Sequence, residues 1–305
     1  MQAMRLMTMA AALGTVFSGA AAAPDWTTVP VANVTLFYPG QYSLELAMTP
    51  AEHKGADRFR DGKDCASCHS GEERAIGGTI ASGKKYETSP IPGKPGFLQA
   101  KVQFAHDAAN LYVRLEFSDA GQPDAKMDEA AAKAAMMLDG GGVPEAARAG
   151  CWAMCHDDSA TMPSAKGAQR SMYLGKTRAR MTRQGGGDAL KSAGELAKLK
   201  AGGYALEYWQ AALNPAAKPA VTNGLVSDRR RQTGSVVTAE ARRNGSMWTV
   251  VFSRKLKAGA VALMPGKRYT VAFAIDAGHT AKRFHYVSFE RSLVLDEGVA
   301  DFVVK

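Results

Sequence analysis

Cysteine is scarce in this sequence, and no cysteine is left over for a second purpose. Only four of the 305 residues are cysteines, and all four lie in two short motifs that each end in Cys-His, Cys65-Ala66-Ser67-Cys68-His69 and Cys151-Trp152-Ala153-Met154-Cys155-His156. A structural disulfide needs no histidine after its second cysteine, yet both motifs supply one. The pattern therefore argues against a disulfide framework and points to one kind of cofactor site.

Long apolar runs and common catalytic signatures are also absent. After the first 22 residues, no stretch approaches the roughly 18 apolar residues of a membrane-spanning helix. There is no P-loop, dinucleotide-binding glycine pattern or nucleophile elbow. The carboxylates show no paired arrangement typical of acid–base catalysis, and no nucleic-acid-binding motif is present. These absences argue against nucleotide-dependent and hydrolytic enzymes and against a nucleic-acid partner.

The first motif has the C-x-x-C-H spacing of covalent haem c attachment. Residues i and i+3 share one face of a helical turn, so Cys65 and Cys68 can both form thioethers with one edge of a porphyrin. His69 lies one step further round and can give the iron its proximal nitrogen. We expect one covalent haem c here.

The second motif has one more residue between its thiols. Cys151 and Cys155 stand at i and i+4, which also share a helical face, so we expect them to hold a second covalent haem c. His156 would be its proximal ligand, and Trp152, inside the attachment loop, would pack on the porphyrin. A zinc-bound or metal-free module is the alternative for these motifs.

The first 22 residues have the pattern of a signal peptide. Arg5 is followed by a mostly apolar run over residues 6–18, and residues 20–23 are four alanines that offer cleavage sites. We expect cleavage after Ala22 and a periplasmic mature protein with no transmembrane anchor. An uncleaved anchor is the alternative, for which the apolar run is short.

The chain is basic, with a formal net charge of +9. Such a surface favours redox partner proteins of the periplasm that are acidic, or a membrane face. The basic cluster Arg229-Arg230-Arg231 is equally typical of a solvated loop or of partners for haem propionates.

The hydrophobic pattern predicts a mainly β fold, an antiparallel β-sandwich with a helical and loop-rich insertion and an irregular N-terminal haem-binding segment. We expect a signal peptide over residues 1–22, an N-terminal haem c segment over 23–95 and the sandwich over 96–305, with an insertion over 119–219 that carries the second motif. Within the sandwich the strongest pattern is a hairpin, with strands over residues 98–105 and 111–117. Further strands are expected over residues 235–241, 247–253, 269–276, 284–290 and 301–304. In the insertion, Asp128–Leu138 and Asp188–Lys200 are rich in helix-favouring residues and predict two helices.

Several of these segments resemble the haem-binding domain of ethylbenzene dehydrogenase γ subunits. The resemblance rests on Phe104–Asp107 with Asn110–Leu115, on Trp248–Leu256 and Tyr269–Asp276, and on Arg283–Ser288, and it covers roughly residues 96 to 305. It implies a β-sandwich related to carbohydrate-binding modules that holds haem, and electron transfer beside a periplasmic enzyme, often a molybdopterin oxidoreductase. Those subunits bind b haem through Met and Lys. This sequence instead carries two Cys-His motifs, so that ligand pair is not transferred.

The sixth ligand of each iron decides between electron transfer and catalysis. For the first haem, His53 is the leading candidate because it lies 16 residues before His69 in the same segment, and Met48 is the nearest methionine. For the second haem the candidates are His285, His106 and Met162, whereas His279 lies in a glycine-containing turn and is expected to be exposed.

The sequence therefore predicts a dihaem c-type cytochrome that relays electrons through six-coordinate irons. The rival is a haem enzyme that acts on peroxide or an oxide of nitrogen at one open iron. A subunit of a molybdopterin oxidoreductase is a further alternative.

Overall fold

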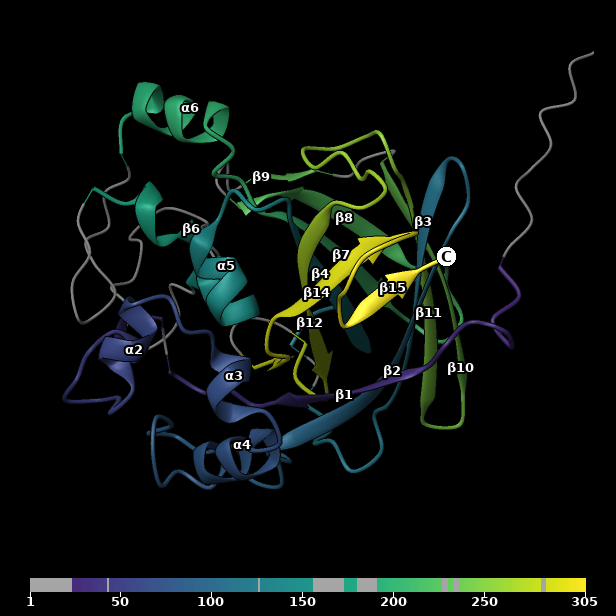
Figure 1. Ribbon diagram of the computed structural model, residues 1–305. Helices are drawn as coiled ribbons and strands as arrows, with labels where there is room; N and C mark the ends of the chain where they lie inside the picture. The colour runs from purple at the N-terminus through teal and green to yellow at the C-terminus, as the bar shows by residue number, and fades with distance from the viewer. Residues whose placement is uncertain are drawn as a thin grey trace, which may run out of the picture.

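A computed structural model describes residues 24–42, 44–125, 127–155, 173–179, 191–226, 230–232, 236–280 and 284–305. One large sheet forms the body of this part of the chain, and the helices gather on one side of it (Figure 1). The predicted mainly β fold is confirmed. No helix within the described ranges is both long and apolar enough to cross a membrane.

The sheet contains 13 strands and is antiparallel except at one pair. Its strands are β1 Ala32–Phe37, β2 Phe97–His106, β3 Asn110–Ser118, β4 Ala132–Asp139, β7 Glu207–Leu213, β8 Ala220–Leu225, β9 Arg230–Gln232, β10 Val237–Asn244, β11 Met247–Lys255, β12 Arg268–Ala277, β13 Tyr286–Val287, β14 Arg291–Leu295 and β15 Phe302–Val304. They follow the order β10-β11-β3-β2-β1-β13-β12-β4-β7-β8-β9, with β14 beside β12 and parallel to β15. Because β10 also contacts β7 and β8, the sheet curls round and encloses a core.

The predicted hairpin is confirmed as β2 and β3, which pair from Ala100 opposite Phe117 to His106 opposite Leu111. The apolar side chains that alternate along β3 all enter the enclosed core, as one face of a half-buried strand should. Four of the five later predicted strands match β10, β11, β12 and β15, with bounds that differ by a few residues. The fifth is shorter than expected, because β13 contains only Tyr286 and Val287.

The helix predicted over Asp128–Leu138 is wrong, because Ala132–Asp139 is strand β4. It pairs with β12 on one side and with β7 on the other. Alanine and methionine favour helices by only about 0.5 kcal/mol per residue over other side chains. Burial outweighs that preference, since every second residue of β4 from Ala132 to Leu138 packs in the enclosed core.

The chain that leaves the sheet is shorter than the insertion expected over residues 119–219. Both β4 and β7 fall in that range, and both are strands of the sheet. Between them lie α5 Pro144–Ala149, the 3-10 helix η1 Gly150–Ala153, the paired strands β5 Met154–Cys155 and β6 Tyr173–Leu174, the 3-10 helix η2 Gly175–Thr177 and α6 Ala193–Ala201. The position of α6 confirms the second predicted helix, which Ser192 and Glu195 begin with a capping box.

The N-terminal segment is irregular only after its first strand. β1 lies in the sheet between β2 and β13, although its sequence shows no sustained alternation. Four short helices follow, α1 Leu44–Ala47, α2 Ala56–Arg60, α3 Cys65–His69 and α4 Glu73–Ala81. α4 packs against β1 and β2, and α3 packs against α5. Figure 1 shows α3 next to α5, with α2 and α4 on the same side of the sheet.

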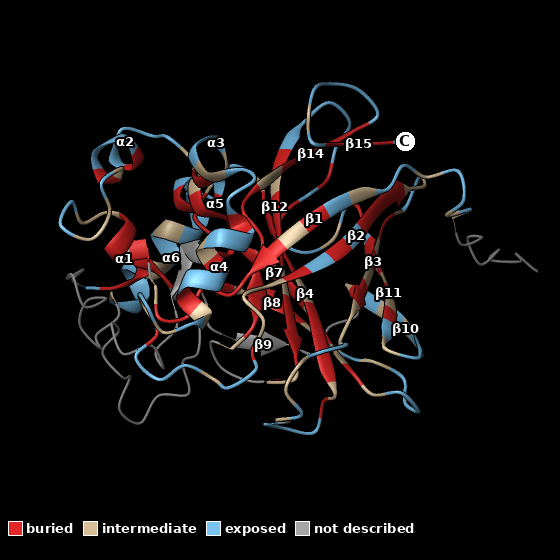
Figure 2. Cartoon of the chain, turned by 90° about the horizontal axis from the view of Figure 1, so that it is seen from below, coloured by how far each residue is buried: buried red, intermediate tan, exposed pale blue. Residues whose placement is uncertain are grey.

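The middle of the sheet is covered on both faces, as the buried residues in Figure 2 indicate. Its inner face surrounds the enclosed core, which includes Trp209, Trp248 and Phe252. Its outer face contributes to a second apolar cluster, called the outer cluster below. This cluster contains Phe37, Phe59, Cys65, Met137, Ala149, Cys151, Ala272, Val287 and Phe289, among others. Cysteines of both motifs therefore lie in one cluster on one face of the sheet.

Candidate functional site

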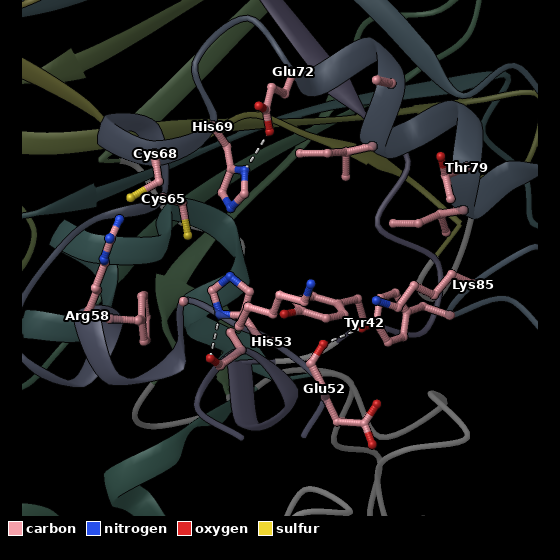
Figure 3. A pocket seen from close by; sticks show the side chains of 18 of the residues that line it. Tyr42, Glu52, His53, Arg58, Cys65, Cys68, His69, Glu72, Thr79 and Lys85 are labelled. Atoms are coloured by element: carbon pink, nitrogen blue, oxygen red, sulfur yellow. Dashed lines mark hydrogen bonds and ion pairs between the residues drawn. The ribbon is translucent and has the colours of Figure 1, made fainter. Parts of the chain in front are cut away.

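The first motif forms the one-turn helix α3 that its spacing predicts. Asp64 is the N-cap residue, and its Oδ1 accepts a hydrogen bond from the backbone N–H of Ser67 at 2.6 Å. The helical turn directs both thiols to the same cavity, with Cys65 buried and Cys68 exposed. Figure 3 shows the two sulfur atoms on one side of this cavity, next to His69.

The cavity has a volume of about 720 Å³, which is in the range typical of cofactor and small-molecule sites. Apolar side chains, among them Phe59, Ile76 and Ile80, form much of its wall. Four basic side chains also line it, Lys54, Arg58, Lys63 and Lys85. An apolar wall with several cations suits a haem, whose macrocycle is apolar and whose propionates are anionic.

His69 is oriented by a carboxylate. Its Nδ1 lies 2.8 Å from Oε2 of Glu72, three residues further along the chain. A carboxylate accepts hydrogen bonds, so Nδ1 carries the proton and Nε2 keeps its lone pair. The ring also stacks on Phe289 with 6.4 Å between centroids. Nε2 of His69 is therefore the nitrogen available to a metal.

His53 is oriented in the same way by a backbone carbonyl. Its Nδ1 lies 2.9 Å from the carbonyl oxygen of Ala47, which can only accept, so Nδ1 carries the proton. Gly55 lies against the ring, and a Cβ there would lie 3.0 Å from Cε1 of His53. Figure 3 shows the rings of His53 and His69 facing each other across the cavity.

The spacing of the two rings fits a shared metal ion. Their centroids are 6.0 Å apart, and the ring planes are inclined by 39°. A bond between a metal ion and an imidazole nitrogen measures about 2 Å, so two such bonds in line span about 4 Å between nitrogens. The separation of the rings leaves room for one iron between their Nε2 atoms. Met48, the alternative ligand, is not among the residues that line the cavity.

Burial keeps the thiols of Cys65 and Cys151 in their neutral form. It raises the pKa of Cys65 far above the ordinary thiol value, and Glu290 and Asp64 add to that shift. It also raises the pKa of Cys151 to about 12. Cys65, Cys68 and Cys151 form no disulfide.

The second motif does not form the helical face that was expected of it. Its backbone runs from η1 directly into β5, which pairs with β6, so Cys151 and Cys155 are not on one α-helix. Gly150 explains part of this path, since it adopts a φ of +55° that other residues avoid. Sγ of Cys151 lies 3.5 Å from the carbonyl oxygen of Phe273 on β12. The side chains of Trp152 and Cys155 and the whole of His156 and Met162 lie outside the described residues.

His285 lies on the outer face of the sheet. It is 8% exposed, and Val287, two residues further on, belongs to the outer cluster together with Cys151. Alternation along a strand puts residues i and i+2 on the same face. Burial raises the pKa of Asp276 on β12, and His285 and Lys133 act in the opposite direction. His285 is therefore close to a buried carboxyl on the face where the motifs lie.

His106 and His279 are held elsewhere. His106 directs Nε2 to Oδ1 of Asp296 at 2.9 Å and Nδ1 to the carbonyl oxygen of Asp107 at 3.1 Å. Phe104, two residues earlier, packs in the enclosed core, so His106 is on the opposite face from the motifs. It fastens the β2–β3 hairpin to the turn after β14 instead of approaching a cysteine. His279 is half-buried and lies against Phe284, not exposed as expected.

Sequence reasoning missed the residues that support the motif, namely Gly55, Glu72, Phe289 and Glu290. Glu72 could have been found, since it stands three residues after His69, the spacing of helical neighbours. Phe289 and Glu290 reach the motif only through the fold, 220 positions and more along the chain. No local pattern marks them.

Two proteins of known identity align with nearly the whole chain. Cytochrome c-552 of Stutzerimonas stutzeri is 39% identical over 292 residues, which cover 93% of this chain and 92% of the relative. Cytochrome c-551 of Rhodocyclus tenuis is 31% identical over 272 residues, which cover 87% and 92%. No family model matches the chain. A solved structure of a family 9 carbohydrate binding module from Caldicellulosiruptor kristjanssonii, in complex with cellotriose, is 10% identical with a TM-score of 0.30 and covers 63% of this chain and 65% of its own.

Proposed function

The chain belongs to the c-type cytochromes represented by these two relatives, and from this premise we propose that it is a periplasmic electron carrier with two haem c groups. Membership of the family implies covalent haem c and a role in electron transfer. The number of haems, the ligands of each iron and the compartment are the parts that we propose.

The geometry around α3 carries the proposal for the first haem. Cys65 and Cys68 would anchor the porphyrin, while His69 and His53 would hold the iron from opposite sides. The support is that both rings direct Nε2 to one cavity and are 6.0 Å apart. The haem supplies an iron that changes between its ferric and ferrous states. Two histidine ligands leave no open position, which favours electron transfer over catalysis.

For the second haem we propose Cys151 and Cys155 as anchors, His156 as proximal ligand and His285 as sixth ligand. The support is that Cys151 and His285 are both buried toward the same face of the sheet. Met162 remains the local alternative. Partner proteins would be periplasmic redox proteins, and the net charge of +9 favours acidic ones.

Haem counting tests the two-haem proposal. Pyridine haemochrome analysis and the intact mass of the mature chain should each give two haems. A mass increase of one haem would contradict the proposal and leave Cys151 and Cys155 without an assigned role. The same mass should show that residues 1–22 are absent.

Ligand substitution tests the coordination. His53→Ala should convert one of the two haems to a high-spin form that binds carbon monoxide rapidly, and His285→Ala should do so for the other. His106→Gln is the matched control, since this histidine faces away from both motifs. An unchanged low-spin spectrum in a ligand variant would exclude that histidine as a ligand of the iron. Rapid carbon monoxide binding by the unaltered protein would favour the enzyme acting on peroxide or nitrogen oxides.

A further inference from the structure

Glu290 is a buried carboxylic acid at the point where the two motifs meet. It lies between β13 and β14 and is 8% exposed. Its Oε1 accepts a hydrogen bond of 2.7 Å from the backbone N–H of Ala66, inside the first motif. Gly150, directly before the second motif, packs on its backbone so closely that a Cβ there would lie 2.8 Å from N of Glu290. One residue therefore contacts both attachment segments.

The second carboxyl oxygen of Glu290 lacks a donor. Oε2 is buried and accepts no hydrogen bond from the described residues. The carboxyl group of Asp64 lies beside it and is itself fixed by the N–H of Ser67. Two carboxylates repel each other, whereas a carboxylic acid donates a hydrogen bond to a carboxylate. A proton on Glu290 would thus give the pair a hydrogen bond and remove the repulsion.

The surroundings of Glu290 favour its protonated form near neutral pH. Burial raises its pKa to about 8, and the charge of Asp64 acts in the same direction, against the hydrogen bond from Ala66. Cys65 in α3 is a further titratable neighbour of Glu290, and Arg148 in α5 is a charged group near that thiol. Arg148 donates from Nη1 to the carbonyl oxygen of Phe59 and from Nε to that of Pro144, not to Glu290.

We propose that in mildly alkaline solution, where Glu290 is ionised while the first haem is oxidised, Glu290 binds one proton from solvent when that haem receives one electron, and releases it when the haem is oxidised again. The electron comes from a reduced redox protein and takes the iron from ferric to ferrous, while the carboxylate of Glu290 becomes a carboxylic acid. The charge of the electron and that of the proton cancel. Added negative charge in a buried region raises the proton affinity of a nearby carboxylate. The inference rests on the proposed function, since it requires haem at Cys65 and Cys68.

Redox titration over a range of pH tests the coupling. Because the reduced form binds the proton more tightly, the potential of the first haem should fall as pH rises, with a slope that approaches about 59 mV per pH unit for one proton per electron. Glu290→Gln should remove that slope. Glu240→Gln, at an exposed carboxylate on β10, is the matched control and should keep it. A pH-independent potential in the unaltered protein would overturn the proposal.

Two further measurements separate this role from a structural one. Reduction should produce the infrared band of a protonated carboxyl group in the unaltered protein and not in Glu290→Gln, and a band retained in that variant would overturn the assignment. Asp64→Asn keeps a good N-cap and removes a negative neighbour, so it should move the sloping region to lower pH. An unmoved region would also count against the proposal. Failure of the proposed function would appear differently, as a haem count below two. A count of two with a pH-independent potential would contradict only the role of Glu290.

Discussion

At the scale of single residues, the orientation of both histidine rings is fixed by hydrogen bonds of Nδ1, the ring nitrogen that faces away from the cavity. His69 is held by Glu72 and His53 by the carbonyl group of Ala47, and both bonds place the proton on Nδ1. The free Nε2 atoms then need no change of tautomer to bind a metal. The sequence indicated His53 and His69, but not the acceptors that fix them. One of these acceptors is a backbone carbonyl oxygen, which every residue has, so no residue type in the sequence could indicate it.

Replacing Glu72 should raise the reduction potential of the first haem. Glu72→Gln keeps an oxygen that accepts from Nδ1 but removes a negative charge that stabilises ferric iron. The Glu72 side chain is 59% exposed, so solvent screens it and the rise should not exceed about 60 mV, a tenfold change in the one-electron equilibrium. Spectroelectrochemical titration of both haems measures it. A lower potential, or an equal rise in Glu240→Gln, would contradict the expectation.

Adding a methyl group at Gly55 should disturb the second ligand of the same iron. In Gly55→Ala the new Cβ would lie 3.0 Å from Cε1 and 3.2 Å from Nε2 of His53, so the ring must shift. We expect a smaller low-spin fraction at one haem and faster carbon monoxide binding. Gly78→Ala is the control, because a Cβ there meets no atom within 4 Å. Spectra of Gly55→Ala that match those of the control would show that His53 does not hold the iron.

At the scale of elements, local patterns sufficed where a segment depends on its own residues. The β2–β3 hairpin was predictable from the alternation of apolar residues, and α3 was predictable from the spacing of its two cysteines. β4 was not, because its alanines and methionines favour a helix in isolation and are strand residues only between β12 and β7. The shared helical face predicted for the second motif was wrong for a similar reason, since Cys155 pairs with Tyr173 of β6 in a strand ladder.

Strand β7 depends on a buried ion pair that the sequence does not reveal. Glu207 accepts hydrogen bonds from Nε and Nη2 of Arg254 at 2.7 and 2.8 Å and from Nε1 of Trp209 at 2.8 Å. Glu207→Ala would leave the guanidinium of Arg254, which is fully buried, without its counter-ion. We expect a loss of about 3 to 5 kcal/mol in the free energy of unfolding. Urea denaturation measures it, with Glu240→Ala expected to change the value by less than about 0.5 kcal/mol.

At the scale of the whole molecule, the fold brings together two motifs that are more than 80 positions apart. The sequence gives the number of motifs and the type of fold, but it contains no signal that both pack on one face of the sheet. That arrangement depends on Phe289 and Glu290, near the end of the chain, which contact α3 and η1 at once. Long-range contacts of this kind follow from topology and not from local pattern.

The stability of the molecule should depend on pH through Glu290. Its pKa is about 8 in the folded chain against 4.5 ordinarily, so between these values the folded chain holds a proton that the unfolded chain has lost. The free energy of unfolding should therefore fall as pH rises through this window, by at most about 1.4 kcal/mol per pH unit from this group. Denaturation of the unaltered protein and of Glu290→Gln at several pH values measures the contribution as a difference in slope. Parallel slopes would contradict it.

The position of His53 and His69 on either side of one cavity also has a consequence for chain entropy. An iron bound to both rings would close a loop of 16 positions. In the chain-entropy model, a cross-link that closes a loop of about that length lowers the conformational entropy of the unfolded chain and stabilises the folded state by roughly 3 kcal/mol. The loop has little core of its own, since in α2 only Ala56 and Phe59 are buried. The cofactor would then cross-link this loop, and loss of one ligand would let the loop unfold locally while the sheet stays folded.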